Sequence, residues 1–122
     1  MILADASVWI DFFRLRKPEL RKLLDNNQVV MHPFLVAELA LGSLHDRPST
    51  LAKLDNMPQV RAVDLRDVRQ MIEARALYGK GIGLTDAHLV ASCLATPGTL
   101  LWTTDGRLGK VAEALGVRAN LA

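Results

Sequence analysis

The sequence predicts one α/β domain over residues 1–122, with a central parallel sheet of four to five short strands and helices on both faces. Short apolar runs alternate with longer segments whose apolar residues recur at helical spacing, a pattern typical of parallel strands joined by crossover helices. The first apolar run, residues 1–4, has no polar position on either face, which suits a strand covered by helices on both sides. The length supports one hydrophobic core and is too short for two.

The helix expected after the first strand has more apolar surface than a single core requires. Ser7 is its expected N-cap, and its apolar side chains, Val8 and Phe12 among them, cover an arc of about 200° on a helical wheel. A helix that packs on one core usually shows an apolar stripe of about 100°. We therefore expect a partner chain to contact the face that includes Val8 and Phe12, and we expect a homodimer.

Proline residues and apolar spacing define the next elements. Pro18 and Pro33 are each expected near the start of a helix, because proline is favoured in the first helical turn. Residues 29–31, between these helices, are predicted to form the second strand. A short helix over residues 51–57 ends at Pro58. The helix after Pro33 is apolar nearly all round, so it is expected to be buried.

The second half of the chain repeats the alternation of strands and helices. The predicted elements are, in order, a weak strand at 60–63, a helix capped by Asp64, a flexible glycine loop at 79–83, a buried helix capped by Thr85, a strand at 99–103, a helix closed by Gly116 and a short edge strand at Val117. The glycine loop lacks both the Lys-Ser/Thr pair and the preceding strand of a P-loop, so no nucleotide site is expected there.

Composition limits the classes of protein that fit. Met1 is followed directly by apolar residues without a basic segment, no uncharged apolar run approaches the roughly 18 residues of a membrane span, and Cys93 is the only cysteine. These features predict a cytoplasmic protein without a disulfide or a cysteine-based zinc site. The formal charge is +2; if four of the 13 acids bind metal ions, nine remain against 15 Lys and Arg, and the resulting +6 would favour a polyanionic partner.

Four acidic residues stand where solvation alone does not explain them. Asp5 and Asp105 follow the first and last predicted strands, and the carboxyl ends of parallel strands meet at one edge of a sheet. Asp86 begins a helix that is otherwise largely apolar. Glu38 lies in the apolar helix after Pro33, with no basic residue three or four positions away, and a lone buried carboxylate is costly unless it is paired, protonated or metal-bound.

Three of these acids also have plainer structural explanations, whereas Glu38 has the weakest one. Asp5 fits a helix cap, Asp86 a helix-dipole residue and Asp105 a turn. Four carboxylates in one pocket are tolerated when divalent cations lie between them, and oxygen ligands without His or Cys favour Mg²⁺, or Mn²⁺ in its place, over zinc. We therefore predict a metal site with Asp5 as the shared ligand, Glu38 and Asp86 beside it, and Asp105 acting through water or on a second ion.

Four segments, in this order, resemble the motifs of PIN domains, and among these the VapC-type toxic ribonucleases of type II toxin–antitoxin modules. They are D-A-S-V-W-I-D at 5–11, H-P-F-L-V-A-E-L-A-L-G at 32–42, G-I-G-L-T-D-A-H-L-V-A-S at 81–92 and L-W-T-T-D-G-R-L at 101–108. The resemblance places the family's catalytic, metal-binding acids on Asp5, Glu38, Asp86 and Asp105. It places the accompanying small hydroxyl residues on Ser7 and on either Thr103 or Thr104.

The resemblance implies a Mg²⁺-dependent endoribonuclease that hydrolyses RNA with metal-activated water, leaves a 5′-phosphate and a 3′-hydroxyl, and is inhibited by a small VapB-like antitoxin. Other classes fit the residues less well. A phosphatase with Asp5 as nucleophile usually has a second acid two positions later, where this chain has Ser7. A receiver domain needs acids that are absent here. A pure interaction module agrees with the apolar first helix but leaves the four carboxylates unexplained.

The remaining conspicuous residues have ordinary structural explanations. The histidines His32, His45 and His88 lack tight ligand spacing, and Trp9, Trp102 and Cys93 are expected in the core. The basic residues that suit either phosphate contact or solvated surface are Arg14, Arg16, Lys17, Lys80 and Arg107. The sequence singles out none of these five.

Overall fold

The computed structural model describes residues 1–121 and has a three-stranded parallel sheet at its centre. β1 (Ile2–Ala4) lies in the middle, between β2 (Val29–Val30) and β3 (Leu100–Trp102). Both outer strands run parallel to β1. The parallel sheet agrees with the prediction.

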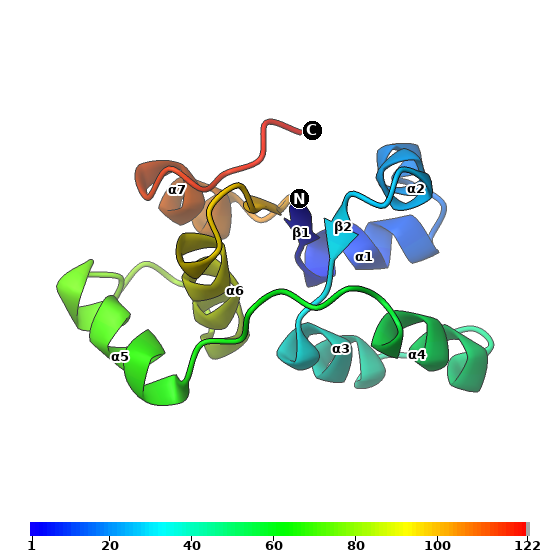
Figure 1. The fold of residues 1–122 in the computed structure, drawn as a ribbon, viewed down its shortest axis with the longest axis horizontal. Helices are drawn as coiled ribbons and strands as arrows, with labels where there is room; N and C mark the ends of the chain where they lie inside the picture. Colours follow the sequence, from blue (N-terminus) through cyan, green and yellow to red (C-terminus); the bar gives the residue numbers. More distant parts are fainter. Residues whose placement is uncertain (122) are drawn as a thin grey trace.

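Seven helices surround the sheet in the described part of the chain. They are α1 (Ala6–Phe13), α2 (Pro18–Asp25), α3 (Pro33–Ala40), α4 (Arg47–Asp55), α5 (Leu65–Ala74), α6 (Leu84–Ala95) and α7 (Gly106–Ala114). Figure 1 shows α6 and α7 on one side of the strands and α1 and α2 on the other, with α3 and α4 below them in this view. α5 packs against α6 on the side away from the strands (Figure 1).

The sheet has three strands where the sequence predicted four to five. The strands predicted at 60–63 and at Val117 are each reduced to a single bridge beside an outer strand. Main-chain hydrogen bonds still hold both segments along the sheet, at 2.8 Å from Val60 N to Met31 O and 2.7 Å from Leu101 N to Val117 O. Each segment leaves the edge too soon to form the consecutive pairs of a ladder, so neither becomes a strand.

The core forms between the sheet and the helices around it. α6 contributes its whole central part, since every side chain from Ala87 to Cys93 is buried, as predicted. Trp9 and Trp102 are also buried, which confirms their place in the core. Burial raises the pKa of the Cys93 thiol to about 12, so this cysteine behaves as a small apolar residue. Within residues 1–121, no helix is long and apolar enough to cross a membrane.

α1 is bound more closely to the core than the sequence suggested. Val8 has no exposed surface, so the prediction that its side chain meets a partner chain is wrong. Phe12 is only partly buried against the core and also lines a groove beside α1. The error arises because α1 packs on α3 as well as on β1, and the second contact buries part of the wide apolar arc. The large apolar side chains that α1 does expose are Ile10 at 41 % and Phe13 at 37 %.

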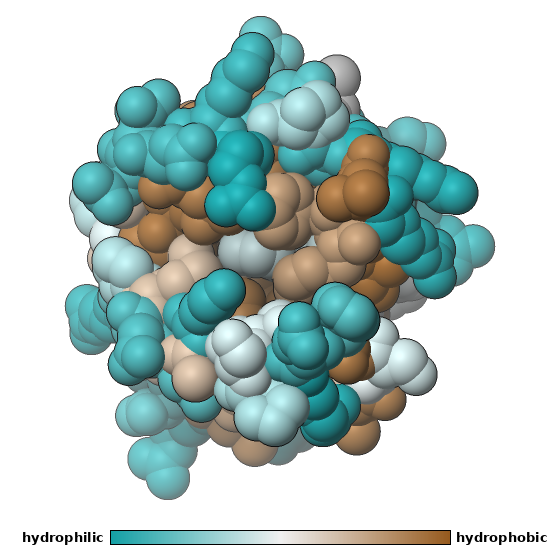
Figure 2. Space-filling view, turned by 90° about the vertical axis from the view of Figure 1, so that its right-hand side faces the viewer, coloured by the Kyte–Doolittle hydropathy of each residue, from teal (hydrophilic) through white to brown (hydrophobic). Residues whose placement is uncertain are grey.

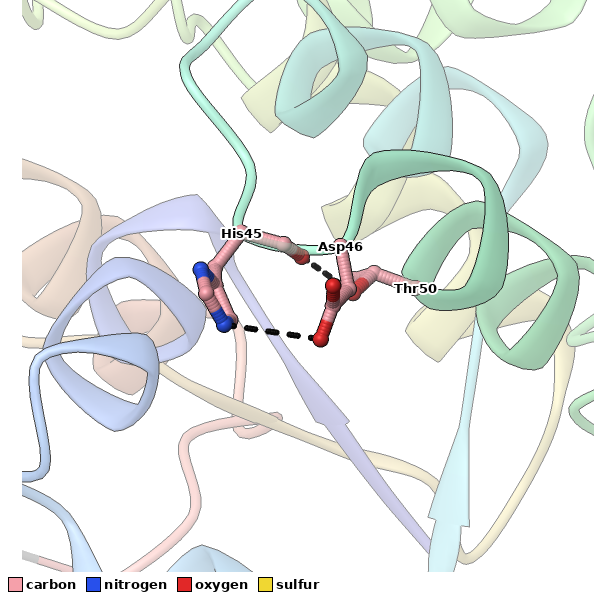
Figure 3. Close-up of polar contacts among 3 residues, drawn as sticks. All are labelled: His45, Asp46 and Thr50. Carbon is pink, nitrogen blue, oxygen red and sulfur yellow. Dashed lines mark hydrogen bonds and ion pairs between the residues drawn. The ribbon is translucent and has the colours of Figure 1, made fainter.

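A groove of about 850 Å³ runs between α1, the start of α2, the end of α3 and the start of α4. Its apolar lining comes from Ile10, Phe12, Phe13, Leu15, Leu39 and Leu44, and its basic lining from Arg14, Lys17, Arg21 and Lys53. Figure 2 shows this face of the molecule, where hydrophobic surface gathers in a hollow between hydrophilic side chains. At the start of α4, His45 Nε2 lies 3.4 Å from the Asp46 carboxylate, and Thr50 Oγ1 donates to the His45 carbonyl at 2.8 Å (Figure 3).

Candidate active site

The site expected from the sequence lies at the carboxyl edge of the sheet, where β1 and β3 end. Ala4 and Trp102 are paired across the two strands, so the residues that follow them, Asp5 and Thr103, leave the sheet side by side. Asp5 is the N-cap of α1 and Asp105 is the N-cap of α7. Two helices therefore begin at this edge, each with a carboxylate at its start.

The Asp5 side chain is buried and is bonded through both carboxylate oxygens. One oxygen accepts from Val8 N at 3.2 Å and from Ser7 Oγ at 2.5 Å, and the other accepts from Thr103 Oγ1. Asp5 is therefore the N-cap of α1, a role that the sequence predicted for Ser7. Ser7 lies inside the first turn of the helix. Capping explains one of the three bonds. The two hydroxyl donors fix the orientation of the carboxylate.

The hydroxyl groups of Ser7 and Thr103 join Asp5 to the start of α7. Thr103 Oγ1 accepts the main-chain N–H of Asp105 at 3.0 Å, and Ser7 Oγ accepts that of Thr104 at 3.1 Å. The sequence left the second hydroxyl residue open between Thr103 and Thr104. The contact with Asp5 comes from Thr103, which is buried, whereas Thr104 is exposed and bonds through its main chain. The pairing of β1 with β3 decides between them, and a single sequence does not reveal that pairing.

Asp105 and Asp86 are bound to the starts of their helices. The Asp105 carboxylate accepts two main-chain N–H groups of the first turn of α7, at 2.9 and 3.1 Å. Asp86 lies in the first turn of α6 and accepts the N–H of Gly83 at 3.3 Å. Gly83 is thus the N-cap, and the assignment of that role to Thr85 is wrong. A helix-dipole role for Asp86 and a turn role for Asp105 account for these contacts. Neither role explains why the two carboxylates lie near Asp5.

The four predicted acids influence one another electrostatically, which places them around one site. Burial raises the pKa of Asp5, and repulsion from Asp105 adds to the rise against the opposing hydrogen bonds. Burial also raises the pKa of Asp86, with further repulsion from Asp5 and Asp105. The pKa of Glu38 is raised by burial and then by Asp86 and Asp5. Asp5 and Asp86 therefore stand at the centre, with Glu38 and Asp105 beside them.

Glu38 is more exposed than the sequence suggested. The buried residues of α3 are Leu35 and Leu39, while Phe34 and Leu41 near its two ends are 43 % and 89 % exposed. The prediction that Glu38 lies inside a buried helix is therefore wrong, since the residue is exposed and its carboxylate is only partly shielded. An apolar helix of this kind faces a groove and the surface as well as the core. Glu38 approaches the other acids from the rim of the site.

The donor set consists of carboxylate oxygens, the type of ligand that Mg²⁺ and Mn²⁺ prefer. All four side chains offer carboxylate oxygens, and the ion pairs found among residues 1–121, His45–Asp46 and Arg118–Glu113, involve none of them. Within the same residues, no three His, Cys, Asp or Glu side chains are placed to hold one ion together. A zinc site needs three or four protein ligands, whereas Mg²⁺ keeps several waters and takes one or two carboxylates.

Known proteins resemble this chain over nearly its whole length. The PIN domain family matches residues 2–114, a range that contains all four acids. Two relatives named ribonuclease VapC32, from Mycobacterium tuberculosis strains CDC 1551 / Oshkosh and ATCC 25618 / H37Rv, are each 38 % identical to it over 117 residues. These residues cover 96 % of this chain and 94 % of each relative. The chain therefore belongs to the PIN domain family.

Proposed function

We propose that this chain is a Mg²⁺-dependent endoribonuclease, able to use Mn²⁺ instead, and the toxin of a type II, VapBC-like toxin–antitoxin module. The observation that carries the proposal is the group of acids at the sheet edge, where Asp5, Glu38 and Asp86 all have raised pKa values and Asp105 repels two of them. Similarity over nearly the whole chain to relatives named ribonuclease supports nuclease chemistry.

In this proposal each acid has a separate part in the chemistry. Asp5 is the central ligand, because Ser7 and Thr103 already hold its carboxylate in one orientation. Asp86 lies beside it, and Asp105 acts through water. When bound, the ion would lower the pKa of the attacking water and stabilise the charge that develops on the phosphate. The raised pKa of Glu38 favours its carboxylate as the acceptor of the water proton. The water oxygen bonds to phosphorus, and the 3′ oxygen leaves with the electron pair of its bond to phosphorus and takes up a proton from solvent water. The products are a 5′-phosphate and a 3′-hydroxyl.

The direct test is cleavage of RNA by the purified protein in Mg²⁺, with and without excess chelator. Asp5→Asn keeps an oxygen that can cap α1, so we expect the fold to persist while cleavage falls at least about a hundredfold. Asp25→Asn, at an exposed acid on the last residue of α2, is the matched control and should cleave normally. Mapped RNA ends that do not change with chelator, or full activity of Asp5→Asn, would reject the metal mechanism.

We also propose that a segment of the cognate antitoxin occupies the groove beside α1. Ile10, Phe13 and Leu15 expose apolar surface there, and the basic lining favours a segment that carries acidic residues. Glu38 lines the same groove, so an occupant would reach the rim of the acidic site and obstruct it. The expected homodimer is a separate prediction, which light scattering on the isolated protein would check.

A further inference from the structure

Arg107 is a cation next to the acidic site that neutralises none of its carboxylates. Its main-chain N–H donates to Asp105 at 2.9 Å, which fixes the residue in the first turn of α7. Its side chain is exposed, and in residues 1–121 its guanidinium forms no hydrogen bond or ion pair. A guanidinium has five donors and a permanent charge, so this one is available to an anion that comes from outside the chain.

The Arg107 side chain lies against the glycine loop before α6, in the space where a side chain of Gly81 would be. A Cβ atom at Gly81 would lie 2.7 Å from Arg107 Cδ and 2.8 Å from Nη1, so any side chain there would displace the arginine. Gly81 also has a φ of +79°, a left-handed conformation that favours glycine. Two residues later, the N–H of Gly83 binds the Asp86 carboxylate at 3.3 Å. The loop therefore carries the Arg107 side chain close to the point where it is attached to the acidic site.

We propose that the Arg107 guanidinium binds a backbone phosphate of RNA next to the phosphate that is cleaved, and that Gly81 lacks a side chain because the arginine occupies that space. This role rests on the proposed ribonuclease function. Carboxylates repel a polyanion, and each nucleotide beside the cleaved bond brings another phosphate to the rim. An arginine held away from the carboxylates offsets this repulsion, and its planar group binds two phosphate oxygens at once.

Variants of Arg107 test the contact, with random-sequence single-stranded RNA as the probe. In Mg²⁺, Arg107→Ala is expected to raise KM about tenfold through loss of a charge-assisted hydrogen bond, with a smaller change in kcat. Arg107→Lys should recover part of this loss, since the charge remains and the two-point geometry does not. Binding measured by fluorescence anisotropy in chelator should show a salt dependence weaker by about 0.7 in log–log slope for Arg107→Ala, the value of one phosphate contact on a single strand.

Two glycine variants separate the position of the arginine from backbone strain. Gly81→Ala strains the loop and displaces Arg107, so we expect KM to rise as it does in Arg107→Ala. Gly79→Ala imposes similar strain, because Gly79 has a φ of +72°, but among residues 1–121 nothing apart from Gly79 and its chain neighbours lies within 4 Å of the added Cβ. We expect both variants to lower the melting temperature and Gly81→Ala alone to raise KM.

The results distinguish a failure of the Arg107 proposal from a failure of the proposed ribonuclease function. If the wild type cleaves RNA while Arg107→Ala keeps the wild-type KM and salt dependence, the role of Arg107 is overturned and the ribonuclease proposal stands. Equal KM changes in the two glycine variants would assign the effect to strain and would also overturn it. If the wild type does not cleave RNA in Mg²⁺, the proposed function fails and this role fails with it.

Discussion

Among single residues, Thr103 makes the contacts of the site that are hardest to replace. Its hydroxyl donates to the Asp5 carboxylate and accepts the N–H of Asp105 at 3.0 Å. Thr103→Val keeps the shape of the side chain but removes the hydroxyl group and both of its hydrogen bonds. The loss lowers the free energy of unfolding by about 1–3 kcal/mol when the two groups left without a partner are shielded from water. We expect the free energy of unfolding, measured with urea, to fall by that amount and RNA cleavage to fall with it.

Thr104→Val is the matched control for this substitution. Thr104 is exposed, and its contact with Ser7 is made by the main-chain N–H, which valine retains. We expect its stability and cleavage to stay close to wild type. Equal losses in the two variants would contradict the assignment of the hydroxyl contact to Thr103.

Without a cation, the carboxylates of the site cost stability. Burial and repulsion from Asp86 and Asp5 raise the pKa of Glu38, so the folded protein disfavours its charged form. A carboxyl group with a raised pKa contributes stability that is fully present below its unfolded-state pKa and is lost as pH rises through its folded-state pKa. In chelator at neutral pH, we therefore expect Glu38→Gln to melt at a higher temperature than the wild type.

Added Mg²⁺ should reverse this order, because ligand binding to the folded state stabilises the protein that binds it better. We expect the melting temperature of the wild type to rise more with Mg²⁺ than that of Glu38→Gln. Glu73→Gln, at an exposed acid on α5, should melt like the wild type in both buffers. A lower melting temperature for Glu38→Gln in chelator would show that the Glu38 charge is compensated in some other way.

Among the elements, the proline-marked starts of α2 and α3 could be predicted. α4 begins at Arg47 with Pro48 in its first turn, although its helix was expected only from residue 51. Helix starts assigned to a small hydroxyl residue were wrong. Pro18 and Pro33 are the first residues of α2 and α3. Ser7 and Thr85 favour cap positions locally, but α1 is capped by Asp5, and Gly83 precedes α6. A cap preference is worth about 1 kcal/mol, so tertiary contacts easily move the start of a helix by one or two residues.

α3 is capped by the buried His32, which makes this element sensitive to acid. His32 Nδ1 accepts the N–H of Phe34 at 3.0 Å, and burial together with repulsion from His88 lowers the pKa of His32 to about 4. The unfolded chain, with a pKa of 6.5, binds more protons between pH 6.5 and pH 4. Stability is therefore lost as pH falls through this range, by up to about 3 kcal/mol from this residue.

His32→Asn should weaken this pH dependence, since asparagine keeps a capping acceptor and does not titrate. We expect the free energy of unfolding of the variant to change less between pH 6.5 and pH 4 than that of the wild type. A residual slope is expected from His88, whose pKa burial also lowers. His45→Asn, at an exposed histidine, is the control. A wild-type slope in His32→Asn would place the acid sensitivity elsewhere in the chain.

For the whole molecule, local patterns predicted the parallel sheet, the buried α6 and the positions of Asp5 and Asp105 at one edge of the sheet. They did not predict what depends on how elements lie against one another. The segments at 59–60 and 117–118 touch the sheet too briefly to form strands. Val8 is buried on a helix that packs against both α3 and β1, and the exposed Glu38 lines a groove. The width of the apolar arc of a helix thus indicates how much of its surface is in contact. It does not reveal whether another element of the same chain or a partner chain makes that contact.

The groove beside α1 gives the test of how the molecule meets a partner. Leu15 and Leu41 are 93 % and 89 % exposed, but Leu15 lines the groove and Leu41 does not. Glutamate at either site leaves the core intact. At Leu15, which has a φ of 60°, glutamate takes on the same backbone strain as leucine.

We expect Leu15→Glu to weaken binding of the proposed antitoxin by about tenfold or more, because a buried leucine contact contributes roughly 1.5–3 kcal/mol. Co-purification and calorimetry would measure this loss. Leu41→Glu should bind like the wild type, and both variants should keep RNA cleavage, since neither residue belongs to the acidic site. Equal effects of the two substitutions would show that exposed apolar surface in general attracts the antitoxin. Unchanged binding of Leu15→Glu would remove the groove from the interface and leave the acidic site unaffected, because Leu15 is not among the four acids of that site.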